Sequence, residues 1–203
     1  MYLPKQFSQP EHAATLMREH PFASLVTTDE TGFPFITHLP LKLVEEGGQP
    51  VQLLGHCARG NPLWGYLQKR PLALASFMGP QAYMSPKVYA DLQRVPTWSY
   101  LAVQARVETR LLEGEEAKDA LLKQLIADHE PAYAAQWRAL PEDYTGKMLN
   151  AIVAFELRIV DLQCAVKLNQ HRPEAHAAMH AAYSVGNAQE QALAVWMKKL
   201  GLV

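Results

Sequence analysis

The sequence predicts a mainly β protein with helical additions, an α+β chain whose strands form a closed or half-closed antiparallel barrel. Roughly six or seven segments are rich in strand-forming residues and are bounded by turn signals. Short turns separate the first three segments, which favours antiparallel pairing. Helical patterns occur near the two ends and once within the strand block. A doubly wound parallel sheet does not fit this order.

The composition excludes several classes of protein. The chain has 203 residues, of which 49% are hydrophobic and 19% charged, so intrinsic disorder is excluded. A net charge of -1 argues against a strongly basic nucleic-acid-binding surface. No apolar run is long enough to cross a membrane, and the first residues lack a secretory signal pattern. We therefore expect a cytoplasmic protein.

The first half of the chain predicts two short helices and a series of strands. Ser8 is a candidate N-cap for a helix over residues 9–20, with Pro10 in its first turn. Asn61 is expected to cap a short helix over residues 61–69, with Pro62 at its first position. The strand candidates of this half are residues 22–28, 33–44, 51–56, 71–78 and, after a Gly-Pro break, 81–84.

The second half alternates long strands with helices. Residues 97–112 alternate apolar and polar positions and form the longest strand candidate, and residues 152–162 form another. Residues 115–130 contain no glycine or proline and carry leucines at helical spacing. The alanine-rich tail over residues 172–200 reads as helix, interrupted near Gly186.

The familiar catalytic and nucleotide-binding motifs are missing. The sequence has no GxGxxG, GxxxxGK[ST], HExxH or GxSxG pattern. His176 and His180 share one face of the tail helix, close to His171, and this spacing could bind a metal. No acidic third ligand stands at a matching spacing, and histidines are common on such helices. We therefore assign no metal site.

The segment after the third strand candidate is the most informative one. Arg59 lies in a short loop, and the helix expected at Asn61 follows at once. A cation beside the N–H groups of a helix start suits a phosphate, although a surface arginine and an ordinary capped helix give the same pattern. Cys57 lies in this segment as either a redox-sensitive thiol or a buried inert one, and burial is the commoner state of free cysteine.

Three later segments also carry polar or aromatic side chains. Ser85 is expected to cap a helical turn opened by Pro86. Trp98 and Tyr100 share one face of a strand, where they either stack on a planar ligand or belong to a core or interface. The polar stretch at residues 167–173 follows the last strand and is either part of a site or a solvated loop.

These four segments resemble one protein family when they are taken together. The patterns are HxARxNPxW at residues 56–64, YxSPxxY at 83–89, VPTWxY at 95–100 and KLxQxR at 167–172. In this order they resemble the PaiB-like family of FMN-binding negative transcriptional regulators. The resemblance extends from residue 1 to about residue 173. Ser99, where asparagine is expected, and residues 169–171, where Ser-Gln-Asn is expected, depart from the family pattern.

The resemblance implies an antiparallel FMN-binding split β-barrel of the pyridoxamine-phosphate-oxidase-like kind. It also implies a homodimer with FMN at the subunit interface. We therefore expect a split-barrel FMN-binding domain over residues 1–165, including a helical segment at 114–139. Residues 166–203 would form a C-terminal helical tail packed on that domain or on its dimer partner.

The family pattern also assigns flavin contacts by position, and it leaves the catalytic residues unknown. The strand edge beside the flavin ring is expected at Thr37, His38, Leu39 and Pro40. The ribityl and phosphate side is expected at His56, Arg59 and Asn61, with Arg59 as the main phosphate cation. The residues expected to close the groove are Tyr83 and Ser85. Contacts from the partner subunit are expected at Trp98, Tyr100, Lys167 and Gln170.

Three functions remain open at this point. The family name indicates a flavin-binding transcriptional regulator, and relatives of the fold indicate an FMN-dependent reductase or oxidase acting on an unknown small molecule. A structural or storage role with another anionic ligand is the third. DNA binding follows from family analogy alone, because the sequence shows no recognisable helix-turn-helix and its net charge is -1.

Overall fold

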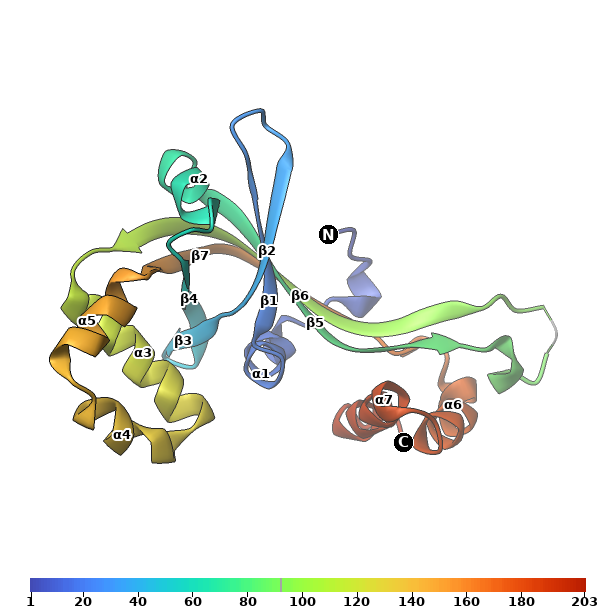
Figure 1. Ribbon diagram of the computed structural model, residues 1–203. Coiled ribbons are helices and arrows are strands. Elements are labelled where there is room, and N and C mark those ends of the chain that lie inside the picture. Colours follow the sequence, from blue (N-terminus) through green and yellow to red (C-terminus); the bar gives the residue numbers. More distant parts are fainter. Residues whose placement is uncertain (92) are drawn as a thin grey trace. The chain divides into compact units, whose positions relative to one another are not determined.

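A computed structural model describes residues 1–91 and 93–203 and contains one seven-stranded sheet (Figure 1). The strand order is β2-β1-β5-β6-β7-β4-β3. β1 is antiparallel to β2 and β5, and β4 is antiparallel to β3 and β7. The strands are β1 Phe22–Thr28, β2 Pro34–Pro40, β3 Lys42–Glu46, β4 Gln49–Ala58, β5 Leu72–Met84, β6 Thr97–Leu112 and β7 Ile152–Lys167. The predicted α+β class and antiparallel sheet are confirmed.

The two outermost strands are joined by a single residue, which closes the sheet. β2 and β3 stand at opposite ends of the strand order, yet only Leu41 separates them in the chain. The sheet must therefore curl until its two ends meet, as in a barrel. Leu41 is 1% exposed, and its N–H donates to the carbonyl of Pro21 at 2.9 Å. The prediction of one strand over residues 33–44 was therefore wrong, because the chain changes edges directly after Pro40.

Gly55 of β4 allows β2 and β4 to approach closely. A Cβ at this position would lie 2.6 Å from Leu41 Cδ2, 3.0 Å from Phe155 Cε2 and 3.3 Å from Leu39 Cδ1. These distances are shorter than ordinary carbon–carbon contacts. Leu39, Leu41 and Phe155 are all buried, so the space that a side chain would take belongs to the barrel core.

The chain divides into two compact units, which we call the terminal unit and the barrel unit. The terminal unit contains Met1–His20, Phe77–Gln104 and Gln163–Val203, and the barrel unit contains Pro21–Ser76 and Ala105–Leu162. Every strand of the sheet contributes residues to the barrel unit, and β5, β6 and β7 also contribute to the terminal unit. The predicted domain boundary at residue 165 stays a prediction.

Two strands of the terminal unit are longer than the sequence patterns indicated. β5 runs without a break through Gly79 and Pro80, and β7 continues to Lys167 instead of ending near residue 162. A Cβ at Gly79 would lie 3.1 Å from Leu16 Cδ2 and 3.2 Å from Leu101 Cβ, so this glycine is a site of close packing. Glycine in a strand can mark such an approach, and here it does not mark a turn.

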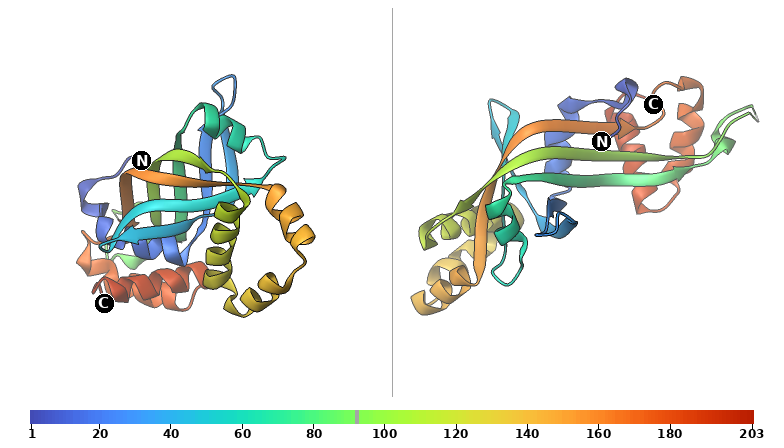
Figure 2. Two further views of the ribbon diagram at one scale, coloured as in Figure 1. Left: turned by 90° about the vertical axis from the view of Figure 1, so that its left-hand side faces the viewer. Right: turned by 90° about the horizontal axis from the view of Figure 1, so that it is seen from above.

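Three helices follow β6 in the barrel unit. They are α3 Glu115–His129, α4 Ala134–Ala139 and α5 Glu142–Asn150, with a 3-10 turn at Pro131–Tyr133. The helical segment expected over residues 114–139 is thus divided at Pro131, which removes a backbone donor. Trp137 Nε1 donates to Asp119 Oδ1 at 2.8 Å and so joins α4 to α3. The views in Figure 2 show these three helices following one another beside the sheet. Residues of all three line a pocket of about 510 Å³.

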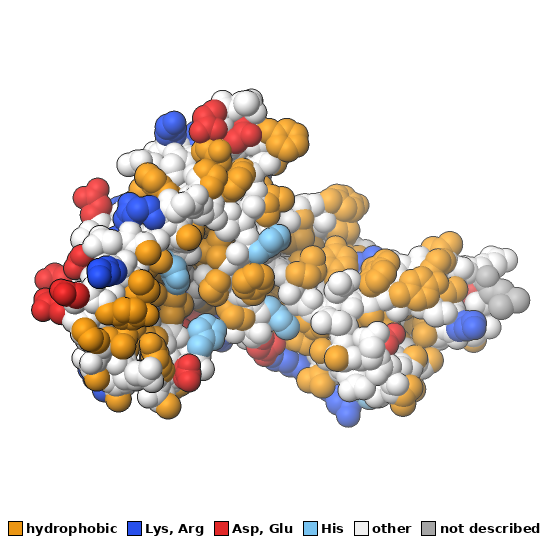
Figure 3. Space-filling view, in the orientation of Figure 1, with side chains coloured by type: hydrophobic (Ala, Val, Ile, Leu, Met, Phe, Trp, Pro, Cys, Tyr) orange, Lys and Arg blue, Asp and Glu red, His pale blue; other side chains and the backbone are white. Residues whose placement is uncertain are grey.

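The helix α5 was not predicted, and part of it is apolar and exposed. Gly146 in its middle lowers helix propensity, which explains why the sequence pattern gave no helix there. Hydrophobic side chains gather over the region of α3 to α5 in the space-filling view (Figure 3). Of α5, Tyr144 and Met148 are exposed. The fourth helix of this unit is α2 Leu63–Lys69, which follows β4.

The terminal unit carries the helices of both chain ends. They are α1 Ala13–Glu19, α6 His176–Ser184 and α7 Ala188–Lys199, with 3-10 turns at Lys5–Phe7, Pro10–His12, Pro86–Val88 and Pro173–Ala175. Ser8 does not cap the first helix as predicted, because a 3-10 turn intervenes and Ser8 forms a β-bridge with Ala165. The expected interruption of the tail is confirmed, and Asn187 with Glu190 forms a capping box at the start of α7. No described helix is long and apolar enough to cross a membrane.

Replacing Gly55 with alanine should destabilise the protein by about 1–3 kcal/mol, the usual cost of overpacking a core. Gly65→Ala is the matched control, since a Cβ at Gly65 meets nothing within 4 Å and the residue lies inside α2. That substitution should stabilise α2 by up to about 1 kcal/mol. Urea unfolding of both variants measures the difference. Equal stability of Gly55→Ala and the parent protein would contradict the close approach of β2 and β4.

Candidate functional site

The residues with predicted flavin contacts fall into two groups, one in each unit. The group in the barrel unit is Thr37, His38, Leu39, Pro40, His56, Arg59 and Asn61. The group in the terminal unit is Tyr83, Ser85, Trp98, Tyr100, Lys167 and Gln170. The expectation that Trp98, Tyr100, Lys167 and Gln170 serve the partner subunit's flavin stays a prediction.

β2 has an open edge with two backbone donors. Among the described residues, β2 pairs with β1 alone. The bonds from Asp29 N–H to Phe33 O and from Leu41 N–H to Pro21 O, both 2.9 Å, show which pairs of this ladder exchange hydrogen bonds. The backbone groups of Ile36 and His38 alternate with those pairs and therefore face the open edge.

Prolines limit the donors at this edge. The backbone of the residues at the two ends of β2, Pro34 and Pro40, also faces the open edge, because these residues alternate with the hydrogen-bonded pairs. As prolines they have no N–H to donate. Proline on an edge strand also blocks unwanted pairing with another strand. The edge therefore offers two N–H groups with accepting carbonyls around them, which suits the polar edge of a planar ring.

The side chains of β2 alternate between the barrel interior and the outside. Leu39 is buried, and Thr37 Oγ1 accepts a bond of 3.3 Å from Asn61 Nδ2. His38 is exposed, with its Nδ1 3.0 Å from Ser24 Oγ and its ring stacked on Phe22 at a centroid distance of 6.4 Å. Asn61 thus joins the loop after β4 directly to β2, so two of the predicted segments meet.

Asn61 also organises the loop itself. Its Oδ1 accepts from the backbone N–H of Leu63 at 3.0 Å, where α2 begins. The N-cap residue is Pro62, so the predicted N-cap at Asn61 was one residue too early. The expected helix is confirmed, with a start two residues later than predicted.

Arg59 holds the start of β7 in this structure. Its Nε donates to Asn150 O at 2.6 Å and its Nη2 to Ile152 O at 3.3 Å, while its backbone N–H donates to Ala151 O at 2.8 Å. Its own carbonyl accepts from Trp64 Nε1 at 2.9 Å. A guanidinium carries five N–H donors, and the two side-chain bonds leave others for a ligand. The side chain is exposed, so a phosphate could reach it.

Lys118 is a second cation in this region, and the sequence analysis did not identify it. The residue is 7% exposed, and its Nζ donates to Leu149 O at 2.9 Å. Burial lowers the pKa of Lys118, and the positive charge of Arg59 lowers this pKa further. Its position three residues before the buried Leu121 could have indicated a lysine that faces inward.

His56 has a ring nitrogen without a partner. The Nδ1 atom is enclosed and makes no hydrogen bond among the described residues. Burial lowers the pKa of His56 below its ordinary value of 6.5, so the neutral ring is favoured. A buried polar atom without a partner is costly, so this nitrogen can bond a ligand group or an ordered water.

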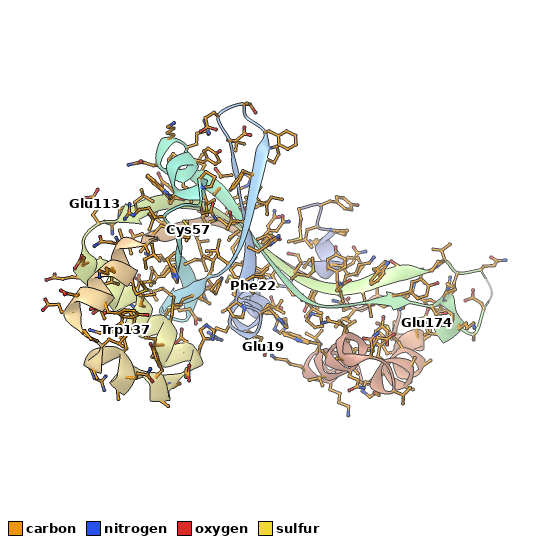
Figure 4. The ribbon with its side chains drawn as sticks, viewed as in Figure 1. Glu19, Phe22, Cys57, Glu113, Trp137 and Glu174 are labelled. Carbon is orange, nitrogen blue, oxygen red and sulfur yellow. The ribbon has the colours of Figure 1, made fainter. Side chains whose placement is uncertain are left out.

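Cys57 is the buried, inert thiol that was favoured above. It is 5% exposed and lies among the strands of the barrel unit (Figure 4). Burial raises the pKa of Cys57 to about 11 and that of Cys164 to about 12. Since the thiolate is the reactive form, neither cysteine is suited to redox chemistry near neutral pH.

Two aromatic contacts connect the predicted residues of the terminal unit. The rings of Tyr83 and Trp98 meet edge to face with centroids 6.5 Å apart. Lys167 Nζ lies 5.9 Å from the centroid of Tyr100 and donates to Thr97 Oγ1 at 2.7 Å. Trp98 and Tyr100 therefore contact different neighbours.

The remaining two predicted residues of this unit stabilise local backbone. Ser85 caps its 3-10 turn as predicted, through a bond of 3.2 Å from the N–H of Lys87. The amide of Gln170 spans its own turn, since it accepts from Leu168 N–H at 2.9 Å and donates to Val166 O at 2.5 Å. Gln170 thereby fixes the chain directly after β7.

The two departures from the family pattern have structural partners. Ser99 is buried, and its Oγ accepts a bond of 3.0 Å from the hydroxyl of Tyr183. Asn169 adopts a left-handed backbone with φ of 62°, which asparagine tolerates better than most residues. His176 places Nε2 2.9 Å from Asn169 O. Among the described residues, no group of three His, Cys, Asp or Glu side chains could hold a metal ion.

Comparisons with known proteins place the chain among flavin-binding folds. Residues 1–161 match the protein family described as "Putative FMN-binding domain". The chain is 33% identical over 177 residues to Protease synthase and sporulation protein PAI 2 of Bacillus subtilis, which covers 86% of this chain and 84% of that protein.

Solved structures agree on the fold. The flavocytochrome Anf3 of Azotobacter vinelandii has a TM-score of 0.63 at 15% identity and covers 81% of this chain and 71% of its own. An FAD and heme binding protein of Mycobacterium smegmatis has a TM-score of 0.60 at 18% identity, over 78% of this chain and 71% of its own. The predicted split-barrel fold and the predicted family are thus confirmed.

The lowered pKa of His56 makes stability depend on pH. The unfolded chain binds the proton more firmly than the folded protein, so the free energy of unfolding should fall as pH drops from about 7.5 to about 5.5. In His56→Gln this loss should be smaller, as measured by urea unfolding at both pH values. His180→Gln, at a residue of the terminal unit, is the control for loss of a histidine. An equal pH dependence in His56→Gln and the parent protein would refute the assignment.

Proposed function

We infer that this chain, which belongs to the FMN-binding family matched by residues 1–161, holds FMN on its barrel unit, at the open edge of β2 and the loop after β4. The observation that carries the proposal is the direct bond between these two segments. Asn61 Nδ2 donates to Thr37 Oγ1 at 3.3 Å. This hydrogen bond links the strand expected beside the flavin ring to the loop expected beside the flavin phosphate.

The donors present match the chemistry of FMN. The backbone of Ile36 and His38 would bond the polar edge of the isoalloxazine ring. Asn61 and the unpartnered Nδ1 of His56 would bond ribityl hydroxyls. The unused N–H groups of Arg59 would bond the phosphate, with Lys118 adding positive potential nearby. Bound flavin supplies the redox chemistry, and the protein supplies position and polar contacts.

A homodimer is the second part of the proposal, and an apolar groove of the barrel unit supports it. The groove has a volume of about 620 Å³ and includes Leu72 and Val160, which are 70% and 53% exposed. Exposed apolar surface of this kind often marks an interface. Arg106 and Asp161 line the same groove. A two-fold axis passing between them would place Arg106 of each copy beside Asp161 of the other.

The biological output that we propose is regulatory, with an oxidoreductase as the alternative. The relative PAI 2 is named a protease synthase and sporulation protein, which supports a role in gene control for this chain as well. The net charge of -1 argues against strong direct DNA binding, so control through a partner or through the flavin is favoured. The alternative is supported by the family's cofactor, since flavins carry hydride and electron transfer.

Arg59→Gln should weaken FMN binding about ten-fold or more while leaving riboflavin binding nearly unchanged, because the two flavins differ only in the phosphate. Arg70→Gln is the matched control. Arg70 also donates Nε and Nη2 to a backbone carbonyl, that of Thr28, at the other end of α2. Fluorescence titration of both flavins measures the affinities. An equal loss of affinity for FMN and riboflavin in Arg59→Gln would contradict the phosphate contact. Arg59 would then only hold the backbone at Asn150 and Ile152.

Two assays on flavin-loaded protein distinguish the regulatory function from the oxidoreductase function. A regulator that acts without catalysis should show no NAD(P)H-dependent flavin turnover, and a direct repressor should shift duplex DNA sequence-specifically with an affinity that falls with salt. We expect neither tight DNA binding nor loss of flavin on purification. Steady turnover with a small-molecule acceptor would favour the oxidoreductase instead.

A further inference from the structure

The terminal unit contains a cavity of about 420 Å³ with an unbalanced charge. Side chains that can carry positive charge line it at Arg94, Lys167, His171 and Arg172. Among the lining residues that the structure describes, none is aspartate or glutamate. A cavity whose lining carries positive charges and no negative ones attracts anions.

Lys167 has donors available for a ligand. Its Nζ gives one bond to Thr97 Oγ1 at 2.7 Å, and an ammonium carries three N–H donors. Lys167 lies at the end of β7, and part of its side chain is accessible. The residue is therefore held in place by the strand and by one neutral hydroxyl, with no carboxylate competing for it in the cavity lining.

The two arginines are only partly neutralised. Arg94 Nη2 pairs with Asp91 at 2.8 Å, and the guanidinium lies 5.0 Å from the ring centroid of Tyr89, whereas its enclosed Nε has no partner among the described residues. Arg172 Nη1 stands 4.0 Å from Glu174, beyond a normal hydrogen bond. Both keep unused N–H donors.

The polar floor of the cavity is preorganised. The side chain of Asn169 and the hydroxyl of Tyr89 hydrogen-bond each other at 2.9–3.1 Å, and His176 holds the carbonyl of Asn169. Asn169 is 7% exposed and has the left-handed backbone described above. Non-glycine residues in this conformation persist where surrounding contacts fix them, as at binding sites.

The rest of the wall is apolar and aromatic. Phe7, Met84, Val95 and Trp98 line it. Binding pockets for small molecules usually combine such a surface with a few polar groups that fix orientation.

We propose that this cavity binds a small molecule with one anionic group, a carboxylate or a phosphate, on an aromatic or similarly flat apolar body. Lys167 and Arg172 would bond the anion, and Trp98 would contact the body. The proposal goes beyond the flavin site proposed on the barrel unit, because every lining residue of the cavity belongs to the terminal unit. It assigns Lys167 and Trp98, for which the family resemblance implied contacts to the partner's flavin, to a second ligand instead.

Isothermal titration of flavin-loaded protein with phenyl phosphate, benzoate and benzyl alcohol tests the proposal. We expect phenyl phosphate or benzoate to bind, the neutral alcohol to show no measurable binding, and affinity to fall with added salt. The stronger of the two anions identifies the charged group. Lys167→Met, which keeps the length of the stem, should weaken binding about ten-fold or more.

Lys198→Met is the matched control, since this exposed lysine of α7 lies outside the cavity lining. Arg172→Gln, at an exposed residue, provides a second variant if Lys167→Met lowers the melting temperature. Equal affinity in both cavity variants and the control would overturn the proposal, as would absence of binding. Release of FMN by phenyl phosphate would also overturn it, because the cavity would then belong to the flavin site. Flavin content of the untreated protein tests the proposed function separately.

Discussion

Closure of the barrel depends on one short connection. Leu41 alone links two strands that lie at opposite edges of a seven-stranded order, so the sheet has no arrangement in which these edges stay apart. Gly55 makes the closure possible by leaving room for Leu41 and Leu39. Everything that follows at the candidate flavin site relies on this closure, because it positions the end of β2 beside β4.

The same closure explains why an exposed strand edge persists in the structure. β2 meets β4 through side chains near Leu39, while its backbone groups at Ile36 and His38 stay unpaired among the described residues. Unpaired edges invite association with other chains, and the prolines at both ends of β2 limit that risk. A ligand with its own donors and acceptors can use the two backbone positions that remain. The polar edge is therefore compatible both with stability and with cofactor binding.

Local sequence patterns predicted most elements but not their ends or their neighbours. The strand β6 has the predicted bounds, because regular alternation over 16 residues is a strong signal. Pro40 and Gly79 were harder to interpret, since a proline or glycine in a strand can mark a turn, a change of edge or a close approach. Those outcomes depend on residues distant in sequence, such as Leu101 beside Gly79. The bonds of Arg59 to the start of β7 and the inward position of Lys118 depend on tertiary contacts in the same way.

The distribution of the two units along the chain has a consequence for synthesis. The barrel unit is complete once Leu162 has been made, whereas the terminal unit combines the first 20 residues with the last 41, Gln163–Val203. On the ribosome, residues near the N-terminus must therefore wait for the C-terminal helices before their own packing is possible. Contacts with such large sequence separation slow folding and expose apolar surface in the meantime. The newly made chain should thus need chaperone protection longest over Met1–His20, which cannot pack fully until Gln163–Val203 has been made.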